Sequence, residues 1–128
     1  MLGRSAFSAM RLTRVVALPG AIDALADRHA ARLCIRVAPD EILLDTDAVE
    51  VDVVDDAHAI VAVDDSYSVA VVSAEDELAR ALEWEFPTTS SVGQGLLHNV
   101  AVRLVRHRNL LLLFCPTAFV HELEERLA

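Results

Sequence analysis

One apolar run near the C-terminus constrains the fold of this chain more than any other feature. In the stretch RHRNLLLLFCPTAFVHELEERLA, the residues LLLLF lie between the polar segment 106–109 and the pair Cys115-Pro116. Because the run has no polar alternation and is followed by a proline, it predicts a central β-strand that is buried on both faces and ends at Pro116. The segment RHRN before it predicts a hairpin turn.

The residues after Pro116 predict a helix that closes the fold. Thr117 is the expected N-cap of this helix. Apolar side chains at helical spacing should form one stripe against a core. The members of this stripe are Phe119, Val120, Leu123 and Leu127. The whole C-terminal block is therefore interpreted as scaffold.

Apolar spacing in the rest of the chain predicts further strands and helices. The expected strands are 14–18, two short strands within 33–46 that turn at 39–41, then 49–53, 66–74 and 96–105. The expected helices are 21–33 and 75–86. Ser73 begins an S-x-x-D capping pattern for the second helix, and Pro87 should end it before a loop at 88–95.

This order of elements predicts an α+β fold of two packed layers, a sheet against helices, built from two strand-helix-strand halves. A hydrophobic share of 54% over 128 residues is typical of one globular domain with a full core. We assign this single domain to residues 11–128. Residues 1–10 are basic and contain no acid, so we expect a flexible N-terminal extension there, with a start at Met10 as the alternative.

Composition argues against two classes of partner and indicates a compartment. The net charge of −9 disfavours nucleic acid, because binding to phosphates requires a basic surface. No membrane span is predicted, since the longest apolar run is far shorter than the roughly 18 residues that a span requires. Cys34 and Cys115 form no CxxC pair, so we expect buried, reduced thiols in a cytoplasmic protein. A single bridge between them is the alternative.

The sequence offers no catalytic, cofactor-binding or metal-binding set. Ten carboxylates between Asp40 and Asp65 interleave with valines and lack the glycine of a calcium loop, which indicates a solvated sheet face. His121 begins a stretch spelled like a zinc helix, but Glu125 stands where the second histidine of H-E-x-x-H is needed. His29 lies on the apolar stripe of its helix, where we expect a half-buried structural histidine.

Two further features have structural explanations. Gly93 and Gly95 precede a predicted strand and no helix, so they do not form a phosphate-binding loop. Trp84 is the one tryptophan of the chain, and we expect it to pack in the core or at an interface.

Two segments between residues 30 and 127 carry a resemblance: VDDSYSVAVVSAEDELARAL, a predicted strand and helix, and RVAPDEILL, a predicted hairpin. They resemble a strand-helix stretch and the P-D-E-W-L-L hairpin of the small gamma subunit of heterotetrameric sarcosine oxidases, a relative of the glycine-cleavage T-protein. The residues at the positions of the family pattern are Asp65, Ser66, Tyr67, Ser73, Leu78, Leu82, Pro87, Gly93 and the stretch NLLLLFCPTAFVHELEERL. Departures are Ile42 for the hairpin tryptophan, Tyr67 for an arginine and Ala74 for a glycine.

The resemblance implies a T-protein-like fold and a non-catalytic small subunit of a flavin-dependent, sarcosine oxidase-type oxidoreductase. Enzymes of this type oxidise the N-methyl or secondary amine of a small amino acid. The partners would be larger flavoprotein subunits, and FAD, FMN, NAD and tetrahydrofolate would be bound by those subunits and not by this chain. The alternative is a stand-alone α+β module, as a monomer or a homodimer, that binds a small molecule on its sheet face or at residues 87–95.

Three arginines near the predicted hairpin are the candidate partner contacts. Arg103, Arg106 and Arg108 cluster in sequence, whereas the acids are concentrated at 40–65. Such a polarised charge distribution could orient the domain against a partner, since charge complementarity sets register and encounter rate. An ordinary solvated turn is the alternative for each arginine.

Overall fold

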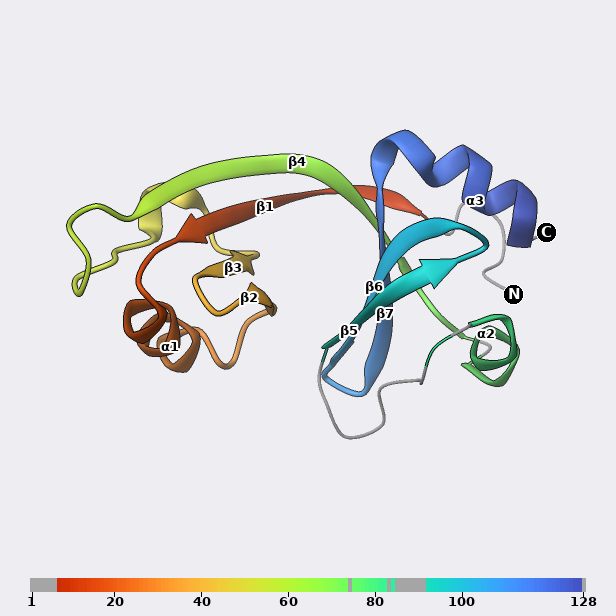
Figure 1. The fold of residues 1–128 in the computed structure, drawn as a ribbon, viewed down its shortest axis with the longest axis horizontal. Helices are drawn as coiled ribbons and strands as arrows, with labels where there is room; N and C mark the ends of the chain where they lie inside the picture. Colours follow the sequence, from red (N-terminus) through yellow and green to blue (C-terminus); the bar gives the residue numbers. More distant parts are fainter. Residues whose placement is uncertain (1–6, 74, 83, 85–91, 128) are drawn as a thin grey trace. The chain divides into compact units, whose positions relative to one another are not determined.

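The computed structural model describes residues 7–73, 75–82, 84 and 92–127, and the fold mixes helices with antiparallel strand pairs (Figure 1). The strands are β1 (Ser8–Val16), β2 (Cys34–Ala38), β3 (Glu41–Leu44), β4 (Ile60–Val71), β5 (Val92–Leu97), β6 (Val100–His107) and β7 (Leu110–Pro116). The helices are α1 (Pro19–Arg28), α2 (Glu75–Ala81) and α3 (Val120–Leu127), with short 3-10 turns at Ala48–Glu50 and Thr117–Phe119. The predicted α+β class is therefore confirmed.

The strands follow the hydrogen-bonded order β2-β3-β1-β4-β7-β6-β5. The described chain divides into two compact units, one formed by residues 11–65 and the other by the residues before 11 and after 65. The boundaries fall inside β1 and β4, so each of these strands contributes residues to both units. Each unit contains a strand, then a helix, then antiparallel strands.

The unit of residues 11–65 is organised around α1. Ile22 and Leu25 of this helix are fully buried and pack with Val15 of β1 and Leu44 of β3. Pro19 occupies the first turn of α1, where its missing N–H costs no hydrogen bond. No side chain within the helix caps this end; instead the backbone N–H of the preceding residue, Leu18, donates to the Asp56 carboxylate at 2.9 Å.

The other unit packs α2 and α3 against one face of its strands. Leu78 of α2 and Leu123 of α3 are fully buried and share a core with alternate residues of β6 and β7. These strand residues are Val100, Val102, Leu104, Leu111, Leu113 and Cys115. The burial of Leu111, Leu113, Phe114 and Cys115 confirms β7 as an internal strand, which lies between β4 and β6 in the order.

Two hairpins connect the last three strands, and their turns explain the local sequence. The β6–β7 turn is Arg108-Asn109, as the RHRN segment predicts, and the β5–β6 turn is His98-Asn99. All four residues have positive φ, between 49° and 67°. Two consecutive residues of positive φ match the twist of a two-residue hairpin, and asparagine tolerates this conformation better than most residues.

Several boundaries differ from the prediction. The segment 49–53 alternates valine with acids but forms a 3-10 turn and irregular chain, so the predicted strand there is wrong. Val49 is 88% exposed, and the acids around it lie in loops and not on a sheet face. The alternation of valines and acids was not sufficient to predict a strand, because a strand also needs a neighbouring strand to hydrogen-bond with. The long strand β4 begins instead at Ile60.

The ends of other elements also shift. β1 begins at Ser8 and so includes the last residues of the segment that was expected to be a flexible extension. The helix predicted for 75–86 ends at Ala81, and Leu82 bridges to Leu97 of β5. Thr117 does not cap α3; its hydroxyl lies 2.9 Å from the Ser68 hydroxyl, and a 3-10 turn precedes the helix. The loop was predicted for 88–95: residues 88–91 lie outside the described residues, and 92–95 belong to β5, so the predicted loop is wrong there.

Candidate functional site

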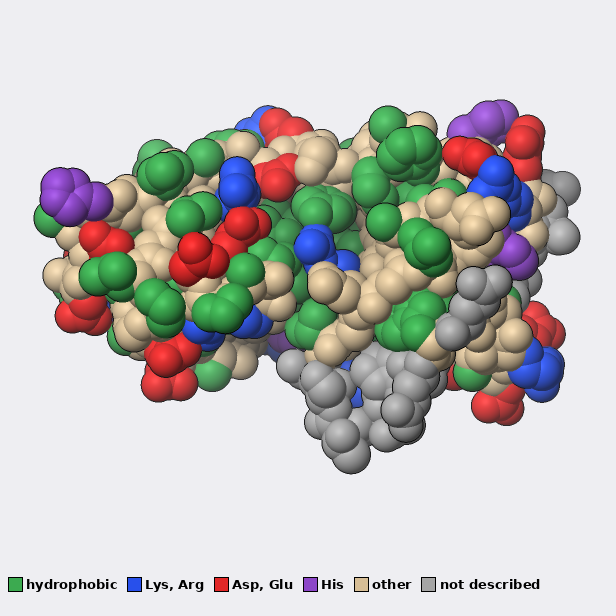
Figure 2. All heavy atoms as spheres, viewed as in Figure 1, with side chains coloured by type: hydrophobic (Ala, Val, Ile, Leu, Met, Phe, Trp, Pro, Cys, Tyr) green, Lys and Arg blue, Asp and Glu red, His purple; other side chains and the backbone are tan. Residues whose placement is uncertain are grey.

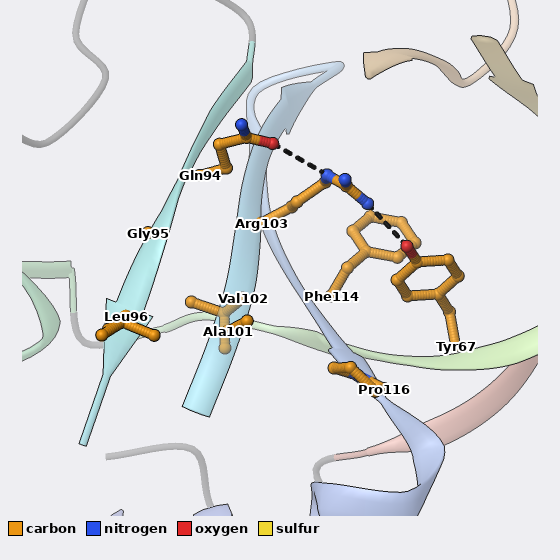
Figure 3. Close-up of a pocket in the computed structure, with 9 residues that line it drawn as sticks. All are labelled: Tyr67, Gln94, Gly95, Leu96, Ala101, Val102, Arg103, Phe114 and Pro116. Atoms are coloured by element: carbon orange, nitrogen blue, oxygen red, sulfur yellow. Dashed lines mark hydrogen bonds between the residues drawn. The ribbon is translucent and has the colours of Figure 1, made fainter. Parts of the chain in front are cut away.

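A hollow on the strands β4, β7, β6 and β5 is the candidate site (Figure 3). Its volume is about 430 Å³, and it is lined by Tyr67, Gln94, Gly95, Leu96, Ala101, Val102, Arg103, Phe114 and Pro116. The strand registers bring these residues together, because Tyr67 pairs with Pro116, Phe114 with Arg103, and Arg103 with Gln94. None of the lining residues is acidic.

The floor of the hollow is on the sheet face opposite to the helix-covered core. Side chains alternate between the two faces of a strand, so Arg103 and Phe114 point away from the face that carries Leu104 and Cys115. Phe114 is only 1% exposed, whereas Leu96 at the edge is 47% exposed. Hydrophobic side chains are exposed at several places on the molecular surface (Figure 2).

Arg103 spans the hollow from one side to the other (Figure 3). Its Nη1 donates to the Tyr67 hydroxyl at 2.6 Å, and its Nε donates to Gln94 Oε1 at 3.3 Å. The guanidinium carbon also lies 5.8 Å from the centre of the Tyr67 ring, within cation–π range. Both acceptors are neutral, so within the described residues the positive charge of Arg103 faces no carboxylate.

The three arginines predicted as partner contacts do not form one cluster. Arg103 and Arg106 are three positions apart on β6, so their side chains leave opposite faces of the strand. Arg106 forms a 2.7 Å ion pair with Glu75 of α2 on the helix-covered side. Arg108 is exposed in the β6–β7 turn. Their role in binding a partner stays a prediction.

The two cysteines are free, and their surroundings disfavour nucleophilic chemistry. Burial raises the pKa of the Cys115 thiol to about 11, and the carboxylate of Glu124 adds to this effect. Burial and the nearby Asp45 likewise raise the pKa of Cys34 to about 11. Because the thiolate is the reactive form, neither cysteine has the character of a catalytic thiol at neutral pH.

The other singled-out side chains have ordinary structural partners. His29 is half-buried at the C-terminal end of α1, as predicted, and its Nδ1 lies 3.3 Å from the Thr46 hydroxyl. His121 lies 3.1 Å from Glu125, its neighbour one turn along α3. Across the described residues, no group of three histidine, cysteine, aspartate or glutamate side chains is arranged to hold a metal ion.

Tyr67 and Gln94 are site residues that no sequence motif singled out. Tyr67 stands at a position of the family pattern where the family has an arginine, and Gln94 lies within the segment 87–95 of the alternative ligand-binding module. One signal was present, because Arg103 falls between the buried Val102 and Leu104 and must therefore point to the opposite face. The strand pairing that brings Gln94 and Tyr67 to that arginine is not encoded in any local pattern.

Comparisons with known proteins give no relative for this chain: no family model, no curated protein and no solved structure matches it. In the part of the chain that the structure describes, no helix combines the length and the apolar character needed to cross a bilayer.

Proposed function

We propose that this chain is a non-catalytic small subunit of a heteromeric, flavin-dependent oxidoreductase of the sarcosine oxidase type. In this proposal the chain adopts the two-layer T-protein-like arrangement, and larger flavoprotein subunits are its partners. Those subunits would bind FAD, FMN, NAD and tetrahydrofolate and would oxidise the amine. The small subunit would contribute to assembly and not to turnover.

The order of elements from β4 to α3 is the observation that carries the proposal. The resemblance implies a strand, a helix, a loop, two strands and a closing helix, and the chain has β4, α2, β6, β7 and α3 in that sequence. β5 is an additional strand between α2 and β6. The P-D-E-I-L-L segment supports the proposal as well, because Pro39 and Asp40 connect β2 to β3 and the residues E-I-L-L form β3.

The raised pKa values of the two thiols support a non-catalytic role for this subunit. A nucleophile needs a lowered pKa or an adjacent base, and both thiols have raised pKa values. The titratable side chains nearest to the hollow are Tyr67 and Arg103, which bind each other. A subunit of this kind would depend on its partners for any reaction.

Co-expression with the reading frames next to its gene tests the proposal. We expect the tagged chain to co-purify with a large chain that carries flavin absorbance, and the complex to oxidise a secondary amine. A chain that is recovered alone from this co-expression, with no flavin in the eluate, would contradict the proposal.

The hairpin at the β6–β7 turn can be tested in the same complex. Arg108→Gln should slow association, because removing a charge at a rim acts mainly on the encounter rate. Arg80→Gln, at an exposed position of α2, is the matched control and should leave the rate unchanged. Equal association rates for the two variants would show that the hairpin is not part of the docking surface.

The alternative function is a stand-alone small-molecule-binding module. The hollow around Arg103 favours it, because a volume of about 430 Å³ is in the range of small-ligand sites. This alternative differs from the first proposal in requiring no partner, so a single species in solution that is stabilised by a small ligand would favour it.

A further inference from the structure

We propose that the hollow formed by β4, β5, β6 and β7 is a binding site for a small organic carboxylate with a flat apolar body. The proposal goes beyond assembly into a heteromer and does not depend on it. It rests on the polar partners of Arg103, on the apolar residues around it and on the absence of acidic residues from the lining.

The guanidinium of Arg103 is held in place but its charge is not neutralised. Its two hydrogen bonds, to the Tyr67 hydroxyl and the Gln94 carbonyl oxygen, use two of the five N–H donors that a guanidinium has. Among the described residues no acceptor is found for the other three. The contrast with Arg11, Arg14, Arg36, Arg106 and Arg126 is clear, because each of these is paired with a carboxylate.

Neutral partners fix the orientation of Arg103 and leave it able to bind an anion. A carboxylate binds a guanidinium through two parallel hydrogen bonds, and the planar fork of arginine is suited to this geometry. A lining without acids matters in a chain of net charge −9, because acidic side chains beside the guanidinium would repel a carboxylate ligand. The local charge around Arg103 therefore favours an anion although the whole chain does not.

The remaining lining selects the body of the ligand. Phe114 lies beneath the hollow and is only 1% exposed, so the aromatic ring that a ligand can reach is that of Tyr67, with Leu96 and Pro116 as apolar residues at the sides (Figure 3). Gly95 contributes backbone only. Flat apolar groups pack well on aromatic rings, so an aromatic carboxylate matches the site better than a short or strongly polar acid.

Three probes separate the charge from the body of the ligand. Benzoate has both features, benzamide has the same body without the charge, and acetate has the charge without the body. Each is titrated into the ¹⁵N-labelled full chain and followed by NMR. Benzoate should give saturable shifts of the Arg103 Nε–H signal and of the backbone amides at 94–96 and 101–103, whereas benzamide and acetate should bind at least about tenfold more weakly.

Substitutions of one residue then test the assignment. Arg103→Met keeps an unbranched apolar side chain and should weaken benzoate binding about tenfold or more, because charge-assisted hydrogen bonds are lost. Arg103→Lys keeps the charge but removes the fork, and should give an intermediate loss. Arg80→Met on α2 is the matched control and should bind benzoate like the unmodified chain. The lysine variant decides the test if the methionine variant does not fold.

Benzoate shifts that do not saturate, that are equalled by benzamide, or that persist in both Arg103 variants would overturn the proposal. The outcome is independent of the assembly proposal. A chain that binds benzoate yet remains alone in co-expression contradicts only the heteromer, and a heteromer whose small subunit ignores benzoate contradicts only the carboxylate site.

Discussion

Arg103 and Arg106 show how one strand places two identical side chains in different chemical environments. Because the two arginines are three positions apart on β6, their side chains lie on opposite faces of the strand. Arg106 lies on the helix-covered face, where its Nη2 is 2.7 Å from Glu75 Oε1. Arg103 leaves the other face and meets only the neutral oxygens of Tyr67 and Gln94. The first arginine therefore ties a helix to the sheet, and the second retains a charge that can act on something else.

The two thiols allow a prediction at the same scale. The pKa of Cys115 rises from 9.0 to about 11 on folding, which lowers its thiolate fraction at pH 8 about a hundredfold. We expect iodoacetamide to modify Cys115 in the native Cys34→Ala variant at least about a hundredfold more slowly than in urea, because burial adds to the loss of thiolate. Mass spectrometry of timed samples measures both rates.

The pH profile of this labelling is the internal control. In urea the rate should level off above pH 9, whereas in the native chain it should continue to rise toward pH 11. The reciprocal variant Cys115→Ala reports on Cys34, whose pKa is raised to the same value but which is only half-buried, and it should react faster than Cys115. A native profile that levels off near pH 9 would contradict the raised pKa.

At the scale of the element, β5 depends on a glycine that was predicted to lie in a loop. A Cβ built at Gly95 would lie 2.5 Å from Nε1 of the Trp84 ring, closer than non-bonded atoms approach. The same ring nitrogen donates to the Leu96 carbonyl at 2.9 Å. Trp84 can therefore cover this part of the edge strand only because residue 95 has no side chain.

The close approach of Trp84 to Gly95, and the open space at Gly20, predict opposite effects on stability when each glycine is replaced by alanine. Gly95→Ala should lower the free energy of unfolding by about 1–3 kcal/mol, because the indole must move and its hydrogen bond is strained. Gly20→Ala is the matched control, since nothing lies within 4 Å of a Cβ there. It lies in the first turn of α1 and should raise stability by about 0.4–1 kcal/mol.

Urea denaturation followed by Trp84 fluorescence measures both changes. Gly95→Ala should also shift the emission of the native state, because the environment of the indole changes, whereas Gly20→Ala should not. An unchanged native spectrum together with unchanged stability in Gly95→Ala would show that Trp84 does not lie against β5.

Elements were predicted well from the sequence where the pattern itself determines burial. The LLLLF run is apolar at every position and therefore predicted β7 as an internal strand, although Leu110 at its start is 48% exposed. The alternation of Val100, Val102 and Leu104 identified the core face of β6. The valines at 49, 51 and 53 follow the same period, yet the chain there is irregular. Whether such an alternating segment forms a strand depends on a neighbouring strand being available, and the sequence of the segment itself does not show this.

The candidate site was only partly predictable for the same reason. The orientation of Arg103 follows from period two on β6, but its partners come from β4 and β5, which are brought into register by two hairpins. One of these, at His98-Asn99, was not predicted because the residues around it were interpreted as a continuous strand. Without that turn, Gln94 cannot be placed opposite Arg103.

At the scale of the whole molecule, the two units share strands although each has its own core. Leu25 belongs to the core of residues 11–65, whereas Trp84 packs against the core of the other unit. Because β1 and β4 each run through both units, unfolding one unit should remove strand residues from the other. We therefore expect the chain to unfold in one cooperative transition.

The substitution Leu25→Ala tests this coupling through a distant reporter. It removes a fully buried side chain and should cost about 2–5 kcal/mol. If the units unfold together, the urea midpoint seen by Trp84 fluorescence should fall as far as the midpoint seen by far-UV circular dichroism. A biphasic dichroism curve with an unchanged Trp84 midpoint would show two independent domains and would contradict the assignment of residues 11–128 to one domain.

The position of the unit boundaries inside β1 and β4 also limits how such a chain can change over generations. Recombination at a boundary between domains usually passes through a linker and leaves both pieces intact. Here a crossover at either boundary would split a strand and leave unbonded backbone in both descendants. The gene is accordingly expected to be inherited and exchanged as one block, and shuffled libraries should yield folded chimeras only when both parents supply β1 and β4 together.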